Sequence, residues 1–164
     1  MRLSVADLCV VHFRSRYLTD EIKAWREERP VPFAESCDRQ VWYGFAETFS
    51  DFPALPDPSI KNPTIHLLKG KDAYAFLLKL VIGFDSKKLG ESNIKRQFLE
   101  GLELFQKEYT EFARSFGLFA DDIKADTRLI QNEICTGFKH QRYELCAKDL
   151  SGYGGAIMRW SSAR

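Results

Sequence analysis

The chain has 164 residues, of which 45% are hydrophobic and 13% aromatic, so it can form the core of one compact domain, which argues against wholesale disorder. The 24 Lys and Arg residues nearly balance the 23 Asp and Glu residues; the net charge of +1 argues against a generally basic nucleic-acid-binding protein. Any contact with RNA must therefore depend on a local patch and on shape.

The first half of the chain is predicted to contain strands and one helix. Thr19 is placed to cap a helix whose first turn is acidic, and Pro30 and Pro32 end that helix. Residues 50–63 contain four prolines and predict a surface loop. Four short apolar runs are predicted to be strands, at Leu8–Phe13, Val31–Ala34, Gln40–Phe45 and Thr64–Leu68.

The second half is predicted to be helical. Ala73–Ile82 is a dense apolar run that Gly83 ends at a C-cap. One helical face carries apolar residues at Ile94, Phe98, Leu102 and Phe105, and Tyr109 and Phe112 extend it. A further helical stripe begins at Phe116, Phe119 and Ile123 and continues to about Ile134. We expect all of these aromatic residues to belong to the core.

Together the patterns predict an α+β fold. The first half should form a small mixed or antiparallel sheet with packed helices, and the second half should be helical. No internal repeat and no low-complexity segment interrupts this organisation.

The four cysteines show neither a C-x-x-C pattern nor the spacing of zinc ligands; they are Cys9, Cys37, Cys135 and Cys146. No apolar run approaches the length of a membrane span, and the N-terminus lacks the sustained apolar run of a signal peptide. We therefore expect a cytoplasmic protein with reduced thiols, no metal, no membrane contact and no DNA partner.

Cys37 and Arg39 suggest the most specific chemistry, and they lie between the second and third predicted strands. A cysteine is a nucleophile only as a thiolate, and a neighbouring guanidinium lowers the pKa of the thiol. Taken alone, such a cysteine is more often an inert core residue, and such an arginine is more often solvated or ion-paired. The two residues by themselves leave both interpretations open.

Two longer motifs include these residues. The first is Ser36-Cys37-Asp38-Arg39-Gln40-Val41-Trp42-Tyr43. The second is Gly83-Phe84-Asp85-Ser86, followed by Gly90-Glu91, Asn93-Ile94 and Gln97. Weaker matches are His12 and the pair Asp126-Thr127. In this order and at this spacing, the motifs resemble the catalytic domain of glutamyl-tRNA reductase, which begins tetrapyrrole (porphyrin) biosynthesis, over roughly residues 5–130.

The resemblance implies roles for six residues. Cys37 would attack the aminoacyl ester, release the tRNA and hold the glutamate as a thioester. Arg39 would bind the carboxylate of the glutamate through a charge-assisted contact. The residues that would line or brace the pocket are Ser36, Ser86, Glu91 and Gln97. Helix capping accounts for Ser86 and Glu91 equally well.

Three polar positions of the family pattern are altered. Phe76 stands where the family has a histidine, Asp38 replaces an asparagine, and Val41 replaces a glutamate. A carboxylate beside the thiol raises its pKa, and the missing imidazole can no longer handle protons. His66 could substitute in space, although a histidine in a strand is more often structural. These changes leave the activity open.

The resemblance implies a catalytic domain at residues 1–130 and a helical extension with a glycine-rich tail at residues 131–164. A dinucleotide-binding domain does not fit in that extension, so we expect no cofactor in this chain and a separate reductase subunit that supplies NADPH. Glutamyl-tRNA is the expected substrate partner. The alternative is a binding or regulatory module for tRNA, a tetrapyrrole or a partner enzyme. Haem ligation by Cys9 and His12 is disfavoured, because these side chains would face opposite sides of one strand.

Overall fold

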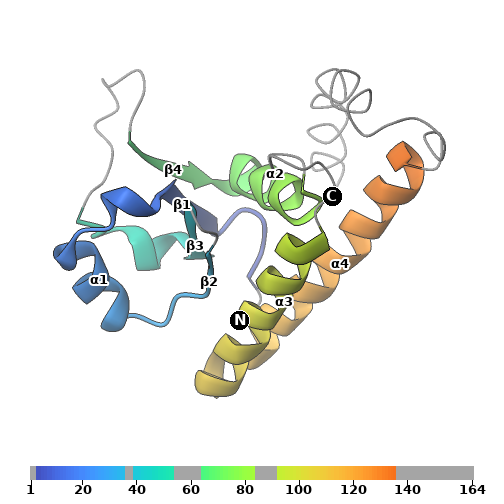
Figure 1. The fold of residues 1–164 in the computed structure, drawn as a ribbon. Coiled ribbons are helices and arrows are strands. Elements are labelled where there is room, and N and C mark those ends of the chain that lie inside the picture. Colours follow the sequence, from blue (N-terminus) through green and yellow to red (C-terminus); the bar gives the residue numbers. More distant parts are fainter. Residues whose placement is uncertain (1–2, 36–38, 54–63, 84–91, 136–164) are drawn as a thin grey trace.

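The computed structural model describes residues 3–35, 39–53, 64–83 and 92–135 (Figure 1). Within these ranges the chain folds into a four-stranded sheet and four α-helices, which confirms the predicted α+β class. The strands are β1 (Leu8–Arg14), β2 (Phe33–Glu35), β3 (Arg39–Phe45) and β4 (Ile65–Lys69). The helices are α1 (Asp20–Glu27), α2 (Gly70–Val81), α3 (Ser92–Glu108) and α4 (Ala113–Cys135). Short 3₁₀ turns are η1 (Ser15–Tyr17), η2 (Ala46–Phe49) and η3 (Thr110–Phe112).

The sheet has the strand order β2-β3-β1-β4, and its neighbouring strands are antiparallel. The first strand of the sequence is therefore an inner strand of the sheet. It pairs with β3 along its whole length, from Leu8 opposite Phe45 to Arg14 opposite Arg39. On its other side β1 pairs with β4, where His12 lies opposite His66.

The sheet separates two apolar cores. In Figure 1, α1 lies on one side of the sheet, and α2, α3 and α4 lie on the other. We call these sides the α1 face and the α2 face. Because side chains alternate along a strand, β1 sends Leu8 and Val10 to the α2 face and Cys9 and Val11 to the α1 face. Alternate residues of β1 thus belong to the two cores.

Aromatic side chains dominate the core on the α2 face. The predicted apolar residues of α3 and α4 are buried there, at Phe98, Leu102, Phe105, Phe116, Phe119 and Ile123. Tyr109 and Phe112 pack against the same core and are partly buried. The ring of Tyr43 from β3 stacks on Phe98 with 5.0 Å between centroids. The predicted assignment of these rings to the core is confirmed.

Two predicted helix boundaries, the start of α1 and the end of α2, are confirmed by hydrogen bonds at the helix ends. The Thr19 hydroxyl oxygen accepts a hydrogen bond from the Ile22 backbone N–H at 3.2 Å, so Thr19 caps α1. Gly83 follows the last turn of α2 with a φ of 74°, and its N–H donates to the carbonyl of Leu80 at 3.0 Å. A positive φ is easily adopted by glycine, so α2 ends where the sequence predicts.

The starts of β2 and α2 differ from the prediction by two and three residues. β2 begins at Phe33 instead of Val31, because the Val31 N–H is used in a turn with the Arg29 carbonyl and Pro32 has no N–H to donate. α2 begins at Gly70, three residues before the apolar run, and the φ of 58° at Gly70 lets β4 turn directly into the helix.

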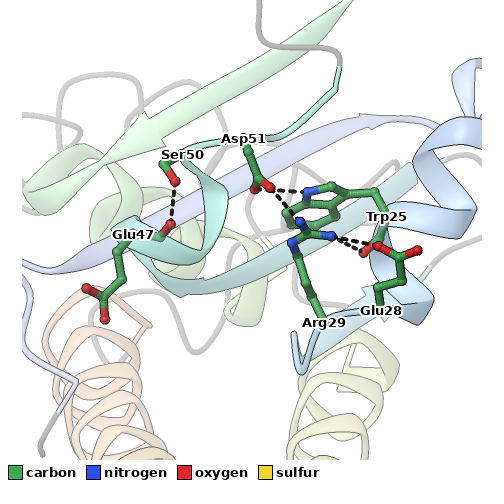
Figure 2. A network of polar contacts seen from close by, with 6 residues as sticks. All are labelled: Trp25, Glu28, Arg29, Glu47, Ser50 and Asp51. Atoms are coloured by element: carbon green, nitrogen blue, oxygen red, sulfur yellow. Dashed lines mark hydrogen bonds and ion pairs between the residues drawn. The ribbon is translucent and has the colours of Figure 1, made fainter.

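On the α1 face, a network of polar contacts joins the end of α1 to the segment after β3 (Figure 2). The Asp51 carboxylate accepts hydrogen bonds from the indole N–H of Trp25 at 3.2 Å and from the Arg29 guanidinium at 2.5 Å. That guanidinium lies 4.9 Å from the centre of the Trp25 ring, and Ser50 donates to the Glu47 carbonyl in the same turn. The hydrogen bond from Trp25 and the charge of Arg29 lower the pKa of Asp51. The network therefore ties α1 to the segment that follows β3.

Helix α3 lies against the outer edge of β2. The Tyr43 N–H donates to the Pro32 carbonyl, so the next residue, Phe33, turns its own backbone groups away from β3. There the Phe33 carbonyl oxygen lies so close to α3 that a Cβ at Gly101 would approach it to 2.8 Å. A glycine at position 101 is thus required for α3 to cover this edge.

Helix α4 continues through residue 130, the predicted domain boundary, as far as Cys135. The glycine-rich segment at residues 151–155 and most of the predicted loop at residues 50–63 lie outside the described residues. In the part of the chain that the structure describes, no helix combines the length and the apolar character needed to cross a membrane.

Replacing Gly101 tests the packing of α3 on β2. Gly101→Ala gains helix propensity of about 1 kcal/mol but must displace a backbone carbonyl, which costs about 1–3 kcal/mol. The matched control is Gly117→Ala in α4, where the nearest atom is the Gln106 side-chain nitrogen at 3.6 Å, an ordinary contact. We expect the free energy of unfolding in urea to be about 2 kcal/mol lower for Gly101→Ala than for Gly117→Ala. Equal stabilities would show that the Phe33 carbonyl does not obstruct a methyl group at position 101.

Candidate functional site

Two of the six predicted site residues, Arg39 and Gln97, lie within the described ranges. The other four lie outside them: Ser36, Cys37, Ser86 and Glu91. Asp38 lies outside them as well. The nucleophile and its pocket therefore remain predictions, and the site is built here from the residues around Arg39.

Two arginines mark one end of the sheet. Arg39 is the first residue of β3 and lies directly opposite Arg14, the last residue of β1. The alternation of side chains places both on the α2 face, Arg39 in line with Val41 and Arg14 in line with His12. Arg39 is half-buried and Arg14 is exposed. Arginines at opposite positions of two neighbouring strands suit an anion such as a carboxylate or a phosphate.

The next row along the α2 face consists of three flat rings. The rings of His12 and His66, from β1 and β4, lie 4.6 Å apart and only 6° from parallel. The ring of Phe76 from α2 lies 4.2 Å from His12 at an angle of 13°. Since two rings cannot occupy the same side of one imidazole, His12 lies between Phe76 and His66. The outermost ring, His66, is exposed, whereas His12 and Phe76 are half-buried.

The surroundings of His12 keep its imidazole neutral. Burial, the neighbouring His66 and the charge of Arg39 lower the pKa of His12 from 6.5 to about 4. In the sheet, Arg39 lies opposite Arg14 and two residues from Val41, the residue opposite His12, so the two arginines form the row next to the rings. An imidazole with this pKa is uncharged at neutral pH and is a weak proton acceptor there.

Two of the positions at which the sequence departs from the motifs that it resembles, Val41 and Phe76, lie in apolar surroundings. Val41 is only 2% exposed and belongs to the core on the α2 face. Phe76 packs against the same core and covers one side of His12. His66 lies on the other side of His12 from Phe76.

Gln97 and the pair Asp126-Thr127 lie on the helices of the α2 face. Gln97 is exposed on α3. Asp126 is 1% exposed within α4, and the hydroxyl of Tyr74 donates to its carboxylate at 2.7 Å. Thr127 is fully buried and donates to the Lys124 carbonyl. Asp126 thus joins α4 to α2 across the core.

Cys9 faces away from His12, as predicted. It is fully buried in the core on the α1 face, and burial raises the pKa of its thiol to about 11. Such a thiol is protonated and unreactive at neutral pH. Among the described residues, no group of three or more His, Cys, Asp and Glu side chains is placed to hold a metal ion.

The stack of Phe76, His12 and His66 could not be recognised from the sequence. His12 and His66 meet only because β4 pairs with β1 in one particular register, and Phe76 joins them only because α2 follows β4 directly. The available signal was the position of each histidine within a predicted strand, which does not specify the register between strands.

No protein family and no curated protein matches this chain. Among solved structures, the chain is similar to the structure titled "Glutamyl-tRNA Reductase from Methanopyrus kandleri", with a TM-score of 0.42 and 16% sequence identity. The similarity covers 74% of this chain and 35% of that chain, so this chain spans about a third of the length of that protein. It is a similarity of fold, and nothing about the site or the activity follows from it.

The low pKa of His12 predicts a pH dependence of stability. The unfolded chain binds a proton at this position below about pH 6.5, whereas the folded chain does so only below about pH 4. The contribution of the neutral imidazole is therefore complete above pH 6.5 and is lost as the pH falls to 4. We expect wild type to lose roughly 2 kcal/mol more than His12→Phe over this range, in urea unfolding measured at successive pH values. Parallel curves for the two proteins would contradict the assignment.

Proposed function

We propose that this chain is a catalytic domain of the glutamyl-tRNA reductase type and forms a glutamyl thioester on Cys37 from glutamyl-tRNA. The observation that carries the proposal is the coincidence of the two motifs, at residues 36–43 and 83–97, in the order and spacing of that family. Such a thioester is an intermediate of tetrapyrrole biosynthesis.

The position of Arg39 supports the proposal. It begins β3 directly after the segment of Cys37, and it lies on the α2 face beside His12 and opposite Arg14. A half-buried guanidinium binds a carboxylate more tightly than an exposed one, because less water competes. Arg39 is thus suited to bind the side-chain carboxylate of the glutamate and to favour the thiolate of Cys37.

The proposed reaction is an acyl transfer. The Cys37 thiol first loses its proton to solvent, and the thiolate attacks the ester carbonyl carbon of glutamyl-tRNA. A C–S bond forms, the C–O bond to the ribose breaks, and the ribose oxygen takes a proton from water as the tRNA leaves. His12 is a weak base at neutral pH because of its low pKa, so no proton transfer is assigned to it.

The proposal places NADPH on another chain. The described strands pair only in antiparallel fashion, unlike the parallel strands joined by crossover helices of the Rossmann type of dinucleotide-binding domain. We propose that a separate NADPH-binding partner supplies the reductant. The chain itself catalyses the formation of the thioester. Without that partner, it releases the glutamate by hydrolysis.

A second candidate function is a binding or regulatory module for tRNA, a tetrapyrrole or a partner enzyme, without catalysis. The observation that favours it is the packing of Phe76 on His12. This contact puts a benzene ring where the family has an imidazole, and it contributes to the burial that lowers the basicity of His12.

Replacement of Cys37 distinguishes the two candidates. We expect wild type, mixed with glutamyl-tRNA labelled in the glutamate and quenched in acid, to move label from tRNA onto protein or into solution. Cys37→Ser should slow this transfer by about a hundredfold or more, because a neutral hydroxyl is a far weaker nucleophile than a thiolate. The control is Cys9→Ala, which removes a buried, unreactive thiol and should transfer label normally. Label that stays on tRNA with wild type would rule out the catalytic function and leave the binding module.

Replacement of Arg39 tests its contact with the substrate. Arg39→Lys keeps the charge but loses the two parallel hydrogen bonds that a guanidinium offers to a carboxylate. We expect about a tenfold rise in KM for glutamyl-tRNA in the same assay, and little change for Arg16→Lys, an exposed arginine of η1. Equal KM values for wild type and Arg39→Lys would remove Arg39 from the proposed site.

A further inference from the structure

The row of three rings ends in an aromatic surface at the edge of the sheet. β4 is the outermost strand on its side of the sheet, and the rings are stacked across the strands, from Phe76 through His12 to His66. The separation of 4.6 Å between His12 and His66 matches the spacing of neighbouring strands. One side of the His66 ring is covered by His12, which belongs to the inner strand β1. His66 is exposed, so the other side of its ring is open to a ligand.

Cationic side chains accompany this surface. Arg14 and Arg39 form the next row of the same face, about 7 Å further along the strands. Arg14 is exposed and forms no ion pair with any other described residue. Flat rings beside guanidinium groups are the components that proteins use to bind single-stranded RNA, the rings for bases and the cations for phosphates. The net charge of +1 means that such binding must come from a local arrangement of this kind.

We propose that the exposed side of His66 stacks on the terminal adenine of the tRNA acceptor end, with Arg14 facing the phosphate of that nucleotide. The inference rests on the proposed function, because it assumes that the substrate is an aminoacylated tRNA. His66 is thereby a positioning residue. It fixes the terminal nucleotide so that the glutamyl ester on its ribose lies toward Arg39.

The geometry favours a nucleobase over a metal-containing ring. Parallel imidazoles present their sides to a neighbour, so the nitrogen lone pairs of His12 and His66 do not converge on one metal ion. The nearby charges of Arg14 and Arg39 repel a cation and attract an anionic backbone. The exposed side of one imidazole also matches the size of a single base, which stacks without sequence-specific hydrogen bonds.

The test compares two RNA hairpins that copy an acceptor stem with its single-stranded end. One hairpin ends in adenosine and the other ends in an abasic nucleotide with the same phosphates. We expect wild type to bind the adenosine hairpin about tenfold more tightly than the abasic one, in fluorescence anisotropy. His66→Ala should lose this difference, and His66→Phe, which keeps a flat ring, should retain it. Thr64→Ala, an exposed change next to the same strand, should behave as wild type.

A second measurement follows the base itself. With 2-aminopurine as the terminal base, we expect wild type and His66→Phe to quench its fluorescence by stacking, and His66→Ala to leave it unquenched. The inference is overturned if His66→Ala weakens the binding of both hairpins equally or changes the binding of neither.

Because the hairpins carry no amino acid, the result is independent of acyl transfer. Base-dependent binding without label transfer supports the stacking site while the catalytic proposal fails. Label transfer with no preference for the terminal base refutes the stacking site alone.

Discussion

The register of β1 is the constraint on which the rest of the structure depends. This strand has a hydrogen-bonded neighbour on each side and a core against each face, so all of its residues but the last are at least half-buried. A shift of one residue would exchange the two sets of side chains and put Val11 where His12 now lies. Such a shift would bury Cys9 among the helices of the α2 face and break both cores at once. The pairing of β1 is therefore what determines which polar side chains can meet.

Along the α2 face, β1 passes from apolar to charged residues. Leu8 and Val10 are fully buried, His12 is half-buried, and Arg14 is exposed. The cost of burying a charge falls along the same path. The imidazole in the middle of the path gives up its charge and stays neutral, whereas the arginine at the end keeps its charge in water. The candidate site is the place where the core ends, which allows a ring surface and a cation to lie side by side.

Local patterns in the sequence were sufficient for the elements that depend on neighbouring residues. The cap at Thr19 and the two apolar stripes, at Phe98–Phe105 and at Phe116–Ile123, require only short-range chemistry and the helical period, and they were predicted correctly. The start of β2 was misplaced, because which backbone groups Val31 and Pro32 have available depends on the turn with Arg29.

The contacts that define the candidate site are long-range. His12 and His66 are joined by a strand register that no local pattern encodes. Cys37, the residue with the most specific chemical prediction, lies outside the described ranges, so the sequence remains its sole support. The resemblance to glutamyl-tRNA reductase therefore identifies candidate chemistry, and the structure contributes the surroundings of Arg39.

The close approach of Gly101 to Phe33 has a consequence for association with other chains. A strand at the border of a sheet offers unpaired backbone groups to any extended peptide, and helix α3 occupies that border at β2. Growth of the sheet by a further strand is therefore obstructed at β2, which leaves β4, the strand that carries His66, as the other border strand of the described sheet. A second chain that docked at β4 by backbone pairing would compete with the nucleotide that is proposed to stack on His66.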